Sequence, residues 1–63
     1  MGRTQQLMEQ SEISSLVILL EDITRRITVM ADKAEAEEDG AATDLIGIER
    51  SLQASLRRLR RLS

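Results

Sequence analysis

Apolar residues in the first half of the chain recur at spacings that alternate between three and four. The series consists of Ile13, Leu16, Leu20, Ile23, Ile27, Met30 and Ala34. A period of 3.5 residues keeps one stripe of a helix facing its neighbours, as in a coiled coil. The pattern therefore predicts a helix from about residue 7 to residue 36 that packs against partner helices.

The middle of this segment is apolar on more than one side. Val17, Ile18 and Leu19 fill positions beside and opposite the seam. A helix that is apolar around its circumference is normally enclosed by several neighbours, so we expect this stretch at the centre of a bundle. The alternative is that Ile18 is a single exposed aliphatic residue.

An acidic stretch ends the first helix. Carboxylates oppose the helix dipole at a carboxyl terminus, and Gly40 can adopt the left-handed conformation that closes a helix. We predict a turn over residues 37–42, with Asp39 or Thr43 as the cap of the next helix. The exposed acidic tip of this turn is a candidate contact surface, and it consists of Glu35, Glu37, Glu38 and Asp39.

The second helix is predicted over residues 44–62. Its apolar positions are Leu45, Ile48, Leu52, Leu56, Leu59 and Leu62. Ser55 interrupts the strict heptad series, and Gly47, inside the helix, costs about 1 kcal/mol relative to alanine. We interpret Gly47 as a position that permits close helix approach.

The two predicted helices differ in length. At about 1.5 Å per residue the first spans roughly 45 Å and the second roughly 28 Å, so residues before Val17 project beyond their own hairpin. We therefore expect an all-α antiparallel hairpin, a single domain over residues 1–63 with residues 1–6 frayed, that assembles into a homodimeric four-helix bundle. A higher oligomer satisfies the same argument. The residues expected to self-associate are Leu7, Met8, Ile13, Leu16, Val17, Leu20, Ile23, Ile27 and Met30.

Composition supports the need for a second chain. The 63 residues include no aromatic residue, no cysteine and no histidine. A domain of this size buries only about 60% of its unfolded surface, and neither a disulfide nor a zinc site is available to stabilise it. Association is the remaining source of stability.

The same composition argues against catalysis and metal binding. With Lys33 as the single lysine, the chain lacks the usual bases and nucleophiles, so we expect no enzyme, no catalytic residue and no cofactor. The acidic turn partly matches the spacing of an EF-hand loop, but Ile46 occupies the place of the bidentate glutamate. We therefore expect no metal site.

Charge is unevenly distributed along a chain whose net charge is −2. We predict helix-supporting ion pairs from Glu21 to Arg25 and from Asp22 to Arg26. An arginine cluster near the carboxyl end is a candidate contact for an anionic partner, and it consists of Arg57, Arg58, Arg60 and Arg61. The hairpin brings this cluster near Glu21 and Asp22, so balancing those acids is the alternative role.

These features favour a protein–protein interaction module, a self-associating helical adaptor or regulator. Two alternatives stay open. The arginine cluster could bind nucleic acid, or the apolar stripe could be completed by a client helix, as in a small chaperone. The longest aliphatic run is far too short to cross a bilayer, and nothing resembles a secretion signal, so we expect a cytoplasmic protein without a membrane span.

Overall fold

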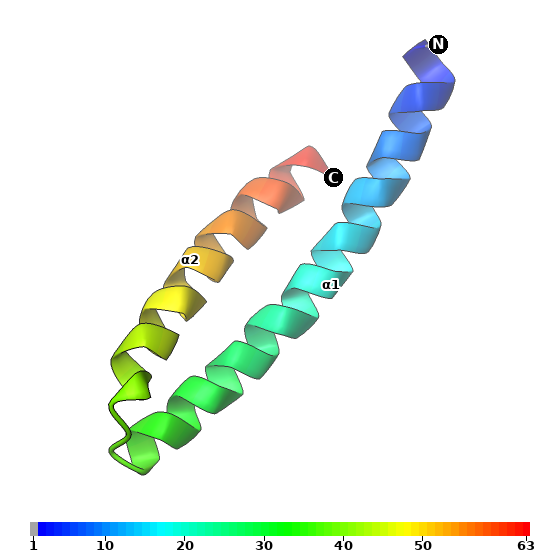
Figure 1. Cartoon of the computed structure of the whole chain (residues 1–63). Coiled ribbons are helices and arrows are strands. Elements are labelled where there is room, and N and C mark those ends of the chain that lie inside the picture. The colour runs from blue at the N-terminus through cyan, green and yellow to red at the C-terminus, as the bar shows by residue number, and fades with distance from the viewer. Residues whose placement is uncertain (1) are drawn as a thin grey trace.

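The chain folds into two helices that run antiparallel and form a hairpin. The computed structural model describes residues 2–63, with side chains from Glu9 onward. Helix α1 spans Gly2–Ala36 and helix α2 spans Ala41–Leu62, and the described residues contain no strand. The two helices pack along the length of α2, while the N-terminal part of α1 extends past the end of α2 (Figure 1). The prediction of an all-α hairpin with a long first and a shorter second helix is confirmed.

The turn closes α1 with a Schellman motif. The Glu38 N–H donates to the Glu35 carbonyl at 3.1 Å, and the Asp39 N–H donates to the Ala34 carbonyl at 2.8 Å. This pair of bonds requires a left-handed residue after the helix end, and that residue is Glu38, with φ of 54°. The left-handed role predicted for Gly40 is wrong, because the chain reverses two residues earlier and Gly40 has φ of −60°.

Helix α2 begins at Ala41, three residues before the predicted start. Gly40 is its N-cap residue and makes no side-chain cap. The Asp39 carboxylate takes over part of that task, because its Oδ1 accepts the Ala41 N–H at 2.9 Å. Thr43 lies inside the helix. Neither predicted residue is therefore the N-cap itself, although Asp39 satisfies one N–H of the first turn.

Small residues form the contact between the helices. Ala31, Ala34 and Thr24 are buried on α1, and Leu56 is buried on α2. Ala31 is only 2% exposed. The Thr24 hydroxyl donates to the Leu20 carbonyl at 2.7 Å, so this polar group is buried without losing a partner. Among the described side chains, Leu56 is the only large one that is enclosed there.

The residues of the predicted heptad seam alternate in exposure at the edge of this contact. Ile13, Leu20 and Ile27 are half-buried and Ala34 is buried. The intervening members are exposed: Leu16 by 44%, Ile23 by 49% and Met30 by 55%. Four members of the seam are therefore at least half-buried in the hairpin, and three are left uncovered.

Replacing Glu38 with glycine tests the strain in the turn. A residue with a Cβ is disfavoured in the left-handed region, so we expect Glu38→Gly to raise the free energy of unfolding by about 0.5–1 kcal/mol. The measurement is urea unfolding followed by circular dichroism. Glu37→Gly removes the same charge at a residue without positive φ, and it should give no gain. Equal effects of the two variants would contradict the assignment of strain to Glu38.

Gly47 has no contact that requires the absence of a side chain. A Cβ built there meets no heavy atom within 4 Å, so the predicted close approach does not occur within the hairpin. We expect Gly47→Ala to raise the free energy of unfolding by about 1 kcal/mol, through helix propensity. Thermal unfolding measures the change. Lower stability together with a lower solution mass would show instead that Gly47 lies in a contact between chains.

Candidate functional site

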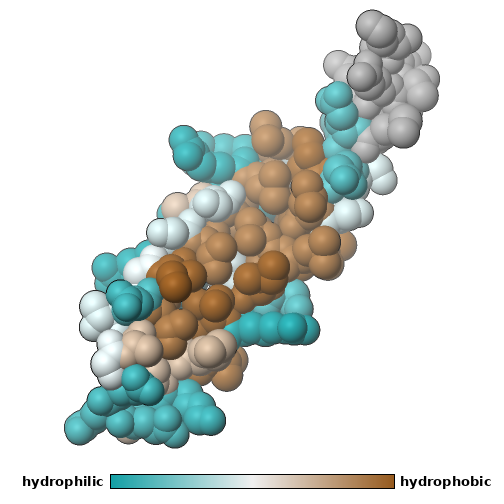
Figure 2. All heavy atoms as spheres, in the orientation of Figure 1, coloured by the Kyte–Doolittle hydropathy of each residue, from teal (hydrophilic) through white to brown (hydrophobic). Residues whose placement is uncertain are grey.

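One side of the hairpin is an apolar face that nothing in the hairpin covers. The face consists of Leu16, Leu19, Leu20, Ile23, Met30, Ile48, Leu59 and Leu62. Six of these large aliphatic residues are exposed, while Leu20 and Leu59 are half-buried. Figure 2 shows the corresponding hydrophobic surface running continuously over both helices. Its area joins side chains from two elements, so it is a patch and not a set of scattered surface residues.

A shallow groove lies in this face near the end of α2. Its volume is about 330 Å³, and its lining consists of Leu16, Leu19, Leu20, Ile23 and Leu59. Only aliphatic side chains line it, and they come from both helices. Such a groove offers no side-chain hydrogen-bonding group to a small polar ligand, whereas a row of apolar side chains from another helix fits its chemistry.

The structure places the predicted self-association residues in three groups. Leu16, Ile23 and Met30 belong to the exposed part of the apolar face. Ile13, Val17, Leu20 and Ile27 are half-buried. Leu7 and Met8 lie outside the residues whose side chains are described. Self-association itself stays a prediction.

Four members of the face are missing from the predicted self-association set. They are Leu19, Ile48, Leu59 and Leu62. The three residues on α2 belong to the apolar stripe of that helix, and this stripe is the sequence signal for them. The sequence-based prediction gives the stripe no role in self-association. Leu19 lies three residues after Leu16 and four before Ile23, so its helical spacing is the signal that places it on the same face.

Ile18 and Val29 lie on α1 away from the apolar face. Ile18 is 65% exposed and is two residues from both Leu16 and Leu20, a step that rotates it to the other side of the helix. In the single chain it is an exposed aliphatic residue, as the alternative interpretation held. The hairpin alone does not enclose Ile18, and its expected position at the centre of a bundle stays a prediction.

The other side of the hairpin carries a polar groove of about 430 Å³. Helix α1 lines it with Glu21, Thr24, Arg25 and Thr28, and α2 with Gln53, Leu56, Arg57 and Arg60. Two side-chain contacts bridge the helices along this side. The Thr28 hydroxyl donates to Glu49 Oε2 at 2.5 Å, and Arg60 pairs with Glu21.

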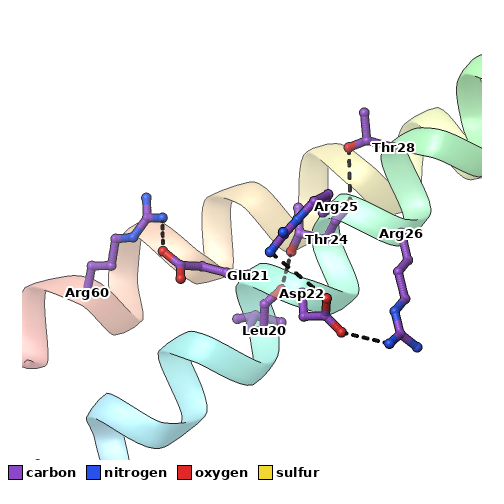
Figure 3. A network of polar contacts seen from close by, with 8 residues as sticks. All are labelled: Leu20, Glu21, Asp22, Thr24, Arg25, Arg26, Thr28 and Arg60. Carbon is purple, nitrogen blue, oxygen red and sulfur yellow. Dashed lines mark hydrogen bonds and ion pairs between the residues drawn. The ribbon is translucent and has the colours of Figure 1, made fainter.

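The predicted ion pairs on α1 are found in part. Arg26 pairs with Asp22 at 3.1 Å, as predicted. Glu21 turns to Arg60 across the hairpin instead of to Arg25, and Arg25 lies 4.0 Å from Asp22 (Figure 3). Glu21 therefore links the two helices, as expected from the antiparallel alignment.

The four residues of the arginine cluster lie on different sides of α2. Arg57 and Arg60 are three residues apart and both line the polar groove. Arg58 and Arg61 are exposed and belong to neither groove. Helical spacing puts residues three apart on the same side and adjacent residues about 100° apart. Two of the four arginines thus line one groove. Contact of all four with an anionic partner stays a prediction.

The acidic tip is fully on the surface. Glu35, Glu37, Glu38 and Asp39 are exposed, and Glu38 and Asp39 contribute backbone and side-chain bonds to the turn. Within the part of the chain described here, no group of three or more acidic side chains is arranged to hold a metal ion.

Neither described helix contains a stretch long and apolar enough to cross a membrane. Comparisons of the chain with protein-family models, with curated proteins and with solved structures gave no match.

The Arg60–Glu21 pair should contribute little to stability. Both side chains are more than a third exposed, so solvent screens the pair. We expect Arg60→Gln to lower the free energy of unfolding by about 0.5 kcal/mol, with the loss disappearing at about 1 M salt. Arg61→Gln is the matched control, since Arg61 has no carboxylate within 4.0 Å among the described side chains. A loss that persists at high salt would point to packing by the Arg60 stem.

Proposed function

We propose that this protein is a non-enzymatic protein–protein interaction module that self-associates through its apolar face. The observation that carries the proposal is the imbalance between buried and exposed apolar side chains. Among the described side chains only Thr24, Ala31, Ala34 and Leu56 are buried, and six large aliphatic residues of one face are exposed. A core this small does not offset the conformational entropy that two helices lose on folding.

A second copy of the chain is the partner that fits best. The exposed seam residues Leu16, Ile23 and Met30 repeat at seven residues, which is the spacing by which helices pack in bundles. Ile48 and Leu62 on α2 extend the face to the second helix. Two hairpins joined by these faces form a four-helix bundle, and the contact is closed because each copy uses the same surface.

The test is the solution mass of Ile23→Asp compared with that of the unmodified chain. Light scattering over a range of concentrations should give a dimer for the unmodified chain. Burying an aspartate in the contact costs several kcal/mol, so the dissociation constant should rise by a factor of about 100 or more. Circular dichroism of the same samples should show that helix is lost as the dimer dissociates.

Ile18→Asp is the matched control. It makes the same substitution on the same helix, at an exposed position away from the apolar face. It should leave both mass and helix content unchanged. A helical monomer for the unmodified chain would overturn the proposal. A poorly folded monomer that becomes helical only with another protein would assign the apolar face to a client helix instead.

A further inference from the structure

The polar groove lies away from the apolar face, and this position keeps it open. Arg25 follows Ile23 by two residues, and Arg57 precedes Leu59 by two. Two residues of helix correspond to a rotation of about 200°, so both arginines lie opposite the apolar face. A bundle formed through the apolar faces would leave one such groove on each outer side.

The groove contains more positive charge than its own acids neutralise. Arg25, Arg57 and Arg60 line it together with one carboxylate, Glu21. Glu21 is engaged by Arg60, and Arg25 only approaches Asp22 at 4.0 Å. Arg57 has no carboxylate within 4.0 Å among the described side chains. Each helix therefore contributes to the groove one guanidinium without a close carboxylate, Arg25 from α1 and Arg57 from α2.

A further donor lines the groove with these arginines. It is Gln53, and no hydrogen bond of its side chain occurs among the described residues. The Thr24 hydroxyl donates to the Leu20 carbonyl, and the single hydroxyl proton of Thr28 lies between the Thr24 carbonyl and the nearer Glu49 carboxylate. The donors that remain are the guanidiniums and the Gln53 amide, and carboxylates are the matching acceptors because arginine holds them in a bidentate manner.

We propose that the polar groove lined by Arg25, Gln53 and Arg57 binds an acidic segment of a partner protein. This inference rests on the proposed function, since it gives the self-associated module a second surface. Two outward-facing grooves make the dimer bivalent. It can join two copies of the partner, which is the task of an adaptor.

Protein carboxylates fit this groove better than a nucleic-acid backbone. Glu21 lies in the groove, and Glu49 accepts from Thr28, which also lines it. Beyond them the hairpin ends in the exposed acidic tip. Glu21 is already paired with Arg60, so the unpaired acids are those of the tip. Duplex DNA presents one charge per about 1.7 Å and would extend onto this tip, whereas a short acidic segment ends before it. The chain also lacks aromatic residues on which bases stack.

The probes are a short fluorescein-labelled polyglutamate peptide, a polyglutamine peptide of the same length and a short labelled oligothymidylate. Binding to the full chain is measured by fluorescence anisotropy at low salt. Polyglutamate should bind, and polyglutamine should not. Arg57→Gln removes a charge-assisted hydrogen-bond donor, so it should weaken polyglutamate binding by about tenfold or more.

Arg58→Gln is the matched control. Arg58 is the neighbouring exposed arginine, carries the same charge and does not line the groove. It should change the affinity by less than about twofold, since screened surface charges contribute little. Equal losses from the two variants would overturn the groove as the site, because binding would then follow the total charge of α2.

Two further outcomes would also overturn the inference. The first is absence of polyglutamate binding by a chain that is dimeric and helical, a result that leaves self-association standing. The second is oligothymidylate binding that exceeds polyglutamate binding and depends on Arg57, which would assign the groove to nucleic acid. Light scattering on every variant separates these results from a failure of the dimer.

Discussion

The contact between α1 and α2 limits what the hairpin can bury, because two helices alone enclose few side chains. On α1 the buried residues are Thr24, Ala31 and Ala34, and all three are small. Leu56 is the only large aliphatic side chain, among those described, that is buried. Most exposed aliphatic residues of the two helices gather on one side, with Ile18 and Val29 as exceptions, and the polar groove lies on the other. The hairpin therefore has two faces of opposite character.

The hairpin could be predicted from the sequence because its signals are local. The heptad spacing of α1, the acids before Gly40 and the leucine spacing of α2 each indicate an element or its end. The division of the seam could not be predicted in this way. Leu20 and Ile23 are both aliphatic members of one series, and periodicity alone does not say which of them faces the helix of the same chain.

Two further differences between the structure and the sequence-based prediction have specific physical causes. Thr24 is polar and carries no sequence signal of burial, yet it is buried because its hydroxyl finds an acceptor in its own helix at Leu20. Gly40 is the expected left-handed residue, yet Glu38 takes that role because the bonds of the Schellman motif end at Ala34 and Glu35. The split of the arginine cluster, by contrast, follows from helical spacing alone and could have been predicted.

Because the buried core is small, the stability of the proposed self-associated fold depends on the amount of protein. When most of the apolar surface is covered between chains, the free energy of folding depends on chain concentration. Under the proposed self-association, dilution of the chain lowers the stability of the fold, and synthesis of more chain raises it. A cell could then set the level of the folded module through expression alone, since chains below the dissociation constant would expose their aliphatic face and be open to degradation.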